Sequence, residues 1–192
     1  MPPQVVKGEL TDTNALSSAV AQATVVVSLL GPNTIRGINP EIYFDFYKEL
    51  FQQMRAHAVR RIFAMSTLSY SVPEDRSSLK RGLLVTLVRT VVPLGYQTVH
   101  RLCQAFLEHA EGLDWTIFRI AGIPGGSDEA SWRQDREDGE VFEGWVGEEG
   151  WCTSQRRGAL ARWLVDAVED GKPQWIGKMP AVSRLAGSAR RA

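Results

Sequence analysis

Hydrophobic and polar positions follow two patterns that alternate along the chain. Short, continuous apolar runs rich in β-branched residues end at glycine or at polar residues, which is typical of strands buried between two layers. Longer stretches carry apolar residues three or four positions apart, as in helices that cover a sheet with one face. The predicted strands are a short one at Val5 and Val6, followed by residues 24–30, 59–66 and 115–120.

The amphipathic stretches predict helices between these strands. The first covers residues 14–22, with Asp12 or Thr13 as its cap, and the second covers residues 40–58, opened by Pro40. Further helices are expected at residues 83–92, 97–111 and 157–169, the last ended by Gly171. Strand and helix alternate almost throughout. The expected fold is therefore α/β, a Rossmann-like parallel sheet with helices on both faces.

The helix at residues 83–92 lies in the longest apolar stretch of the chain, the 13 residues from 82 to 94. A helix that crosses a bilayer needs about 20 apolar residues. Because this stretch is shorter and contains Arg89, it predicts no membrane span. We expect a helix that is either buried or faces a partner.

The composition indicates a single folded domain over residues 1–192. The 22 basic and 22 acidic residues cancel, so total charge predicts neither a nucleic-acid surface nor a polybasic membrane anchor. Neither Cys103 nor Cys152 has the spacing of a metal ligand, so we expect no disulfide framework and no metal site. The first residues lack a signal-peptide pattern, which favours a cytoplasmic protein.

Charge is nevertheless uneven along the chain. Residues 128–150 contain nine acids and two bases, whereas residues 151–192 contain eight bases and three acids, so the two segments are expected to face each other. The acidic segment, residues 127–150, is interpreted either as a solvated loop or as a lid over a substrate, because it carries Trp132, Phe142 and Trp145. Residues 181–192 are interpreted as a basic tail.

An ordered set of short motifs carries a family resemblance. The motifs are GEL at residues 8–10, SLLGPN at 28–33, RRIFAMST at 60–67 and LDWTIFR at 113–119, together with His100. In order and spacing they resemble the NAD(P)-binding atypical short-chain dehydrogenases over about residues 5–180. The resemblance is to the NmrA-like and biliverdin-reductase-B-like branch, which includes averufin-oxidase-type oxidoreductases. It implies NADP(H) or NAD(H) as the cofactor and a small aromatic molecule as the substrate.

The chain departs from this family at its beginning. Members open with a strand and a glycine-rich turn that binds the cofactor pyrophosphate, and this chain shows no such opening. The resemblance therefore implies that the first two strand-helix units are lacking and that cofactor binding is weak if they are truly absent. The strand at Val5 must then pair with residues 24–30, pair with another chain in a homo-oligomer or strand-completing complex, or stay loosely ordered.

The resemblance also implies a set of cofactor-binding residues at strand ends and on one helix. They are Glu9, Leu30, Gly31, Pro32, Asn33, Met65, His100 and Arg119. Plain turn chemistry explains residues 31–33 equally well, and Glu9 also fits an exposed carboxylate at a strand end. Relatives often follow the arginine with proline, whereas Ile120 follows Arg119 here.

Candidate catalytic residues are Ser66, Tyr96 and Tyr70. Ordinary short-chain dehydrogenases pair a tyrosine with a lysine four residues later, because the ammonium lowers the pKa of the phenol. None of the four tyrosines has that lysine, but Tyr96 is followed by His100, whose protonated ring could act in its place. Alternatively, Ser66 is a polar strand end and His100 binds a cofactor ribose or a backbone carbonyl.

These observations predict an NAD(P)-dependent oxidoreductase-like protein. Its expected substrate is an aromatic or quinonoid small molecule, such as a fungal polyketide intermediate of secondary metabolism. The alternatives are a non-catalytic, NmrA-like regulator that senses a dinucleotide and an inactive truncated homologue. The missing tyrosine-lysine spacing favours the alternatives, and the tryptophan-bearing segment favours a substrate pocket.

Overall fold

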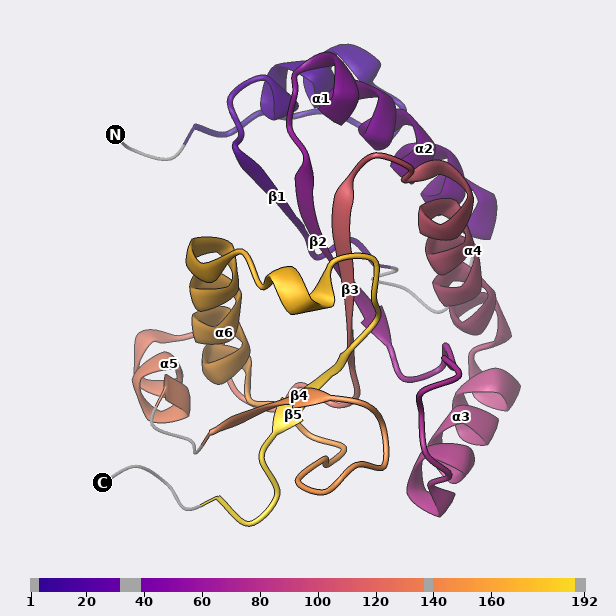
Figure 1. Ribbon diagram of the computed structural model, residues 1–192, viewed down its shortest axis with the longest axis vertical. Coiled ribbons are helices and arrows are strands. Elements are labelled where there is room, and N and C mark those ends of the chain that lie inside the picture. The colour runs from indigo at the N-terminus through magenta and orange to yellow at the C-terminus, as the bar shows by residue number, and fades with distance from the viewer. Residues whose placement is uncertain (1–3, 32–38, 137–139, 189–192) are drawn as a thin grey trace.

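A five-stranded sheet forms the centre of the molecule (Figure 1). The computed structural model describes residues 4–31, 39–136 and 140–188. The strands lie in the order β1 (Val25–Ser28), β2 (Arg61–Thr67), β3 (Asp114–Ile120), β5 (Ala181–Arg184) and β4 (Val141–Gly144). The first four are parallel neighbours, and β4 is antiparallel to β5. Ser66 of β2 lies opposite Arg119 of β3, so their carboxyl ends share one edge.

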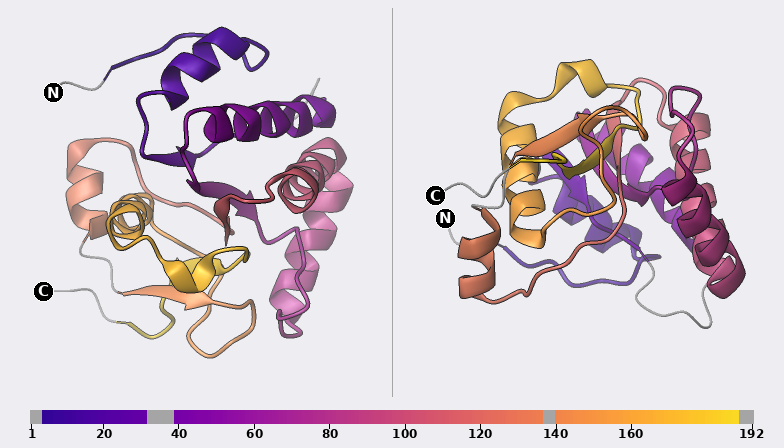
Figure 2. Two further views of the ribbon diagram at one scale, coloured as in Figure 1. Left: turned by 45° about the horizontal axis from the view of Figure 1, so that its top comes forward. Right: turned by 90° about the horizontal axis from the view of Figure 1, so that it is seen from below.

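Helices cover both faces of the sheet (Figure 2). One face is covered by α1 (Thr13–Val20), α2 (Pro40–Ala56) and α4 (Pro93–His109), and the other by α6 (Arg157–Asp170) with α5 (Glu129–Arg136) beside it. Helix α3 (Leu79–Val91) packs on α4, and the short 3-10 helix η1 (Pro173–Trp175) precedes β5. This arrangement confirms the predicted α/β, Rossmann-like fold.

Alternating side chains of the strands enter two separate cores. On the α2 and α4 face, Phe106 contacts Tyr47 and Phe51 with ring centroids 5.0 and 4.8 Å apart. On the α6 face, Trp163 packs edge-on against Phe118 at 5.3 Å. The β-branched and aromatic runs therefore fill both sides of the sheet, as a sheet between two helical layers requires.

Local sequence explains where the first helices begin. The Asp12 side chain accepts a hydrogen bond from the backbone N–H of Ala15 at 2.9 Å, which caps α1. Asn39 accepts one from the N–H of Glu41 at 3.1 Å, and Pro40 follows as the first residue of α2. The predicted cap of α1 is confirmed, with Asp12 rather than Thr13 in that role, and the predicted start of α2 at Pro40 is confirmed.

The predicted strand at Val5 and Val6 is wrong. Neither residue belongs to a strand, and Val5 is 77% exposed. Within the residues that the structure describes, β1 ends the sheet with β2 as its neighbour. Val5 and Val6 have no neighbouring strand, so sheet hydrogen bonds do not satisfy their backbone groups. Residues 4–9 form a segment without regular secondary structure that leads to α1.

The acidic and basic segments are also more ordered than expected. Residues 127–150 contain α5 and β4, so they are not a loop throughout, and their interpretation as a lid stays a prediction. The basic tail is wrong for residues 181–184, which form β5 with Val182 buried. Each of these strands has four residues, which is too short for a clear hydrophobic pattern in the sequence.

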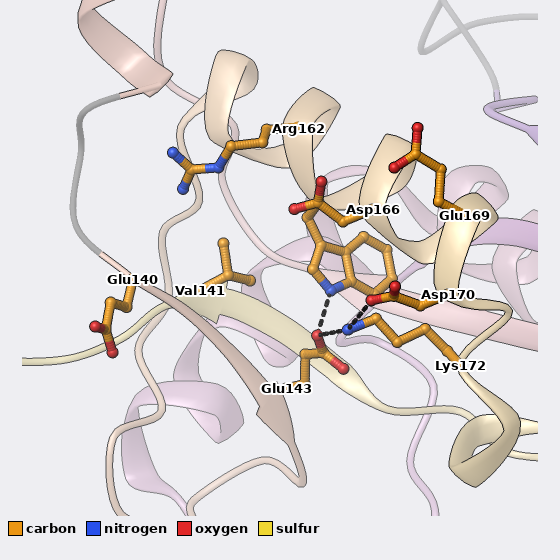
Figure 3. A pocket seen from close by; sticks show the side chains of 9 residues that line it. Glu140, Val141, Glu143, Arg162, Asp166, Glu169, Asp170 and Lys172 are labelled. Atoms are coloured by element: carbon orange, nitrogen blue, oxygen red, sulfur yellow. Dashed lines mark hydrogen bonds and ion pairs between the residues drawn. The ribbon is translucent and has the colours of Figure 1, made fainter.

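The acidic and basic segments face each other, as predicted. The Glu143 carboxylate of β4 accepts a hydrogen bond from Lys172 at 2.8 Å (Figure 3). It also accepts hydrogen bonds from the indole N–H groups of Trp163 and Trp175 at 2.8 and 2.9 Å. Burial alone would raise the pKa of Glu143, but these donors and the Lys172 charge lower it below its usual value. Glu143 lines a cavity of about 440 Å³, but its carboxylate is already bonded to three groups of the fold.

A buried ion pair stabilises the loop that follows β2. Arg119 of β3 is fully buried, and its guanidinium donates to both carboxylate oxygens of Asp75 at 2.6 and 2.7 Å. It also donates to the backbone carbonyls of Tyr70 at 2.9 Å and Met179 at 2.7 Å. Burial alone would raise the pKa of Asp75, but Arg119 and the N–H groups of Val72 and Val146 lower it. One side chain thus joins β3, the loop at residues 68–78 and the segment before β5.

Removal of this guanidinium tests its contribution to stability. Arg119→Met leaves the Asp75 carboxylate buried without its main partner, so we expect the free energy of unfolding to fall by about 3–5 kcal/mol. Urea denaturation followed by tryptophan fluorescence measures the loss. Arg133→Met is the matched control, because Arg133 and Glu129 form an exposed pair, and there we expect a loss below about 1 kcal/mol. Equal losses in the two variants would contradict the assigned role.

Candidate functional site

A pocket lies beside the carboxyl end of β2. The loop after this strand, the first turns of α4 and one side of α3 enclose a cavity of about 490 Å³. Its wall includes Tyr70 from the loop, Arg81 and Val85 from α3, and Tyr96 and His100 from α4. In open parallel sheets ligands bind beyond the carboxyl ends of the strands, so this cavity is the candidate site.

Three aromatic rings meet on one wall of the pocket. Tyr96 and His100 are one turn apart on α4, and their ring centroids lie 4.3 Å apart at an interplanar angle of 39°. Tyr70 approaches the same imidazole with centroids 5.1 Å apart. Burial raises the pKa of the Tyr70 phenol. The wall therefore offers an aromatic contact surface with polar atoms at its rim.

His100 carries an unsatisfied polar atom in this wall. Its Nε2 is buried and has no hydrogen-bond partner among the described residues. Burial lowers the pKa of His100, and a hydrogen bond with the Ser69 backbone partly opposes this effect. The imidazole is thus neutral near pH 7 and has a free ring nitrogen, and a buried polar atom without a partner indicates a position that a ligand can satisfy.

Arg81 forms the polar side of the pocket. Its guanidinium donates to the Leu68 carbonyl at 2.9 Å and to the Ser71 hydroxyl at 2.5 Å, and it lies 3.9 Å from Asp75. Burial lowers the pKa of Arg81, and the Asp75 charge opposes this effect. Arg81 therefore ties α3 to the loop whose shape is set by the Asp75 and Arg119 pair.

The structure brings three of the predicted residues together and separates the others. Tyr70, Tyr96 and His100 share the pocket. Ser66 is buried beneath it, with its hydroxyl 3.5 Å from the Cys103 sulfur. Burial raises the pKa of that thiol to about 12, so this pair is a neutral contact of the core.

The remaining cofactor predictions fall elsewhere. Met65 packs with the core on the α6 face, and Arg119 is occupied by the ion pair with Asp75. Leu30 packs on the α2 and α4 core, and a Cβ added to Gly31 after β1 would meet no atom of the described residues within 4 Å. Glu9 is exposed in the segment before α1. The predicted residues Pro32 and Asn33 lie outside the described residues.

Sequence reasoning missed the contribution of α3 to the site. The helix begins at Leu79 rather than residue 83, because the Ser78 hydroxyl caps it by accepting the N–H of Arg81 at 3.3 Å. This earlier start brings Arg81 into the pocket wall beside Val85. The signal was available, since serine followed by an apolar-periodic stretch is a typical helix start.

Among the described residues, two positions at the sheet edge can receive polar groups of a dinucleotide. They are Nε2 of His100, which has no partner there, and the side of Gly31 that a Cβ would occupy. The start of α2 is unsuited to phosphate, because Asn39 already caps it, Pro40 lacks an N–H and Glu41 is acidic. No other phosphate cradle is evident in the described ranges, and no group of three or more potential ligands there could hold a metal ion.

Solved structures with the same fold are found at low sequence identity. A short-chain dehydrogenase/reductase from Veillonella parvula, solved in complex with NADP, is 15% identical with a TM-score of 0.65 over 98% of this chain and 76% of that one. The oxidoreductase ylbE from Lactococcus lactis is 14% identical, with a TM-score of 0.62 over 98% and 73%. ChuY, an anaerobillin reductase from Escherichia coli O157:H7, is 12% identical, with a TM-score of 0.61 over 97% and 77%.

The sequence itself provides the family assignment. No curated protein matches the chain. The family model described as NAD(P)H-binding matches residues 2–171, which is most of the chain. This match agrees with the predicted cofactor class, NAD(H) or NADP(H), and with the oxidoreductase-like fold. The chain therefore belongs to the NAD(P)H-binding family.

Proposed function

We propose that the protein is an NAD(P)-dependent oxidoreductase that acts on a planar, conjugated carbonyl or hydroxy compound. The observation that carries this proposal is the wall of Tyr70, Tyr96 and His100, in which a buried ring nitrogen lacks a partner among the described residues. Aromatic rings favour a flat ligand, and a single free nitrogen favours one polar group on its edge. The cavity of about 490 Å³ admits a molecule of two or more fused rings.

His100 is assigned the proton transfer. Its hydrogen bond with Ser69 occupies one ring nitrogen and leaves Nε2 for the ligand. The neutral ring accepts a proton from a substrate hydroxyl at Nε2, and the protonated ring returns it to a carbonyl oxygen in the reverse direction. A bound NAD(P)+ would accept the hydride when the hydroxyl is oxidised, and a bound NAD(P)H would supply it when the carbonyl is reduced. Tyr70 and Tyr96 hold the flat ring against the imidazole, and Leu30 and Gly31 are proposed to meet the cofactor at the end of β1.

The substrate class is chosen from the pocket. A quinonoid compound, such as a fungal polyketide intermediate, presents a flat ring and a carbonyl edge to this wall. The anaerobillin reductase of Escherichia coli, by its name, acts on another conjugated molecule, and its similar fold is compatible with this choice. Ser66 has no place in the proposed reaction, because its hydroxyl is buried against Cys103.

A second candidate function is a regulator that binds a dinucleotide without turnover. One observation favours it: the residues four positions after the tyrosines are Tyr47, Phe51, Glu74 and His100, so the usual lysine is missing. A depressed imidazole pKa leaves little protonated His100 near pH 7, which also makes a poor replacement for that lysine.

Replacement of His100 separates these functions. With NADPH and 1,4-naphthoquinone as the probe, we expect His100→Gln to lower kcat by about 100-fold, because it removes general acid-base transfer. KM should change little, since the tyrosines remain. NADPH consumption measures the rate. His57→Gln is the control, because His57 is exposed and bonds Ser17 away from the pocket.

The outcome distinguishes an enzyme from a sensor. An unchanged kcat in His100→Gln would overturn the proposed proton transfer. Saturable NADPH binding, followed by tryptophan fluorescence, with no consumption of NADPH across a panel of quinones would favour the regulator. Tyr96→Leu should raise KM more than it lowers kcat, because it removes the ring contact and leaves His100 in place.

The environment of His100 also predicts a pH dependence of stability. The folded-state pKa lies below the usual value of 6.5, so the unfolded chain binds this proton first as the pH falls. The contribution to stability is complete above the unfolded pKa and is lost below it. We expect the melting temperature of the wild type to fall more steeply from pH 7 to pH 5 than that of His100→Gln. The same fall in melting temperature from pH 7 to pH 5 in the wild type and in His100→Gln, with His57→Gln as the reference, would contradict this expectation.

A further inference from the structure

Helix α3 exposes a stripe of large apolar side chains. Leu79, Leu83, Leu87 and Val91 follow one another at intervals of four and are 89%, 75%, 58% and 64% exposed. Residues four apart share one side of a helix, so these side chains form a continuous surface. Isolated exposed leucines are ordinary, whereas a contiguous apolar stripe marks an interaction surface.

The fold itself does not use this stripe. Helix α3 has no buried residue among those described, and it packs on α4 at a distance from the sheet (Figures 1 and 2). Its inner side provides Arg81 and Val85 to the pocket wall. The stripe therefore faces away from both cores, and of the two possibilities left by the sequence, a buried helix is wrong.

The surrounding charge indicates what binds there. Helix α3 contains three bases, Lys80, Arg81 and Arg89, and no acid, although the whole chain carries no net charge. Arg81 lies on the pocket side of the helix, 3.9 Å from Asp75. An apolar stripe on a helix whose charged residues are all basic is typical of helices that lie on anionic lipid. Total charge predicted no membrane anchor, and its local distribution changes that expectation.

A second copy of the chain fits this surface less well. An antiparallel pair of α3 helices would bring Lys80, near the start of one helix, next to Arg89, near the end of the other. The helix contains no acid that could compensate the repulsion. The like charges therefore disfavour self-association and favour a negatively charged surface.

The neighbouring helix defines the orientation. No single described helix is long and apolar enough to cross a membrane; α3 and α4 together meet the length and composition criteria only across a bend of 111°. Helix α4 buries Leu102, Cys103 and Phe106 in the core, so it is committed to the fold. Helix α3 is left to lie along a surface rather than to pass through one.

We propose that α3 docks in the plane of an anionic lipid surface through Leu79, Leu83, Leu87 and Val91. In this orientation the aromatic pocket lies across α3 from the lipid, one helix diameter (~10 Å) away, because the inner side of α3 forms part of its wall. On the proposed function, the substrate is then an apolar quinonoid molecule that partitions into the bilayer. The docking itself rests on the stripe and the charge alone.

Vesicle binding tests the proposal. We expect the protein to sediment with vesicles of phosphatidylcholine and phosphatidylserine, more weakly with phosphatidylcholine alone, and less as salt increases. The affinity of the double variant Leu83→Gln/Leu87→Gln for the vesicles should be lower by about 10-fold or more. The control is Val165→Gln, since Val165 is 57% exposed on α6, and it should bind as the wild type does. Circular dichroism verifies that each variant is folded.

The remaining outcomes are decisive. Equal binding by the double variant and the control would overturn the proposal, as would no sedimentation of the wild type. A dimer in vesicle-free solution that the double variant loses would assign the stripe to a second copy instead. His100→Gln should still bind vesicles, and the double variant should still reduce a water-soluble quinone, so failure of the docking and failure of the proposed function remain separate.

Discussion

The buried contact between Arg119 and Asp75 determines the shape of the functional edge. Arg119 lies in the middle strand of the sheet, where a buried charge is costly unless it is paired and hydrogen-bonded. It meets this requirement by drawing in a loop carboxylate and two backbone carbonyls. The loop after β2 is consequently held in one conformation, and Tyr70 and Arg81 are positioned through it. A structural ion pair thus creates the pocket without lining it.

The two faces of the sheet have different roles: the α6 face contributes stability, and the opposite face carries residues of the pocket. The α6 face and the contacts of Glu143 with Lys172, Trp163 and Trp175 join the acidic and basic segments into the fold. The opposite face carries α4, whose buried side fills the core while Tyr96 and His100 reach the pocket. Rigid packing beneath these two residues keeps the rings in register, which binding of a flat molecule requires.

Long, strongly patterned elements could be predicted from the sequence, and short ones could not. The runs that became β2 and β3 are seven residues long, and the starts of α1 and α2 are indicated by Asp12 and Pro40. Strands β4 and β5 are four residues long, and β4 joins the sheet through β5. The predicted helix at residues 97–111 excluded Tyr96, whereas α4 begins at Pro93 and places Tyr96 one turn from His100. The pairing of Arg119 with Asp75 joins positions 44 residues apart and leaves no local pattern.

Helix α3 is shared by two environments, since its inner side borders the pocket and its outer side carries the apolar stripe. A shift of this helix therefore changes both the pocket wall and the position of the apolar stripe. By thermodynamic reciprocity, if docking at the stripe tightens the hold on a ligand, the ligand tightens docking by the same factor. A single thirteen-residue element could thereby couple where the protein resides to whether its pocket is filled.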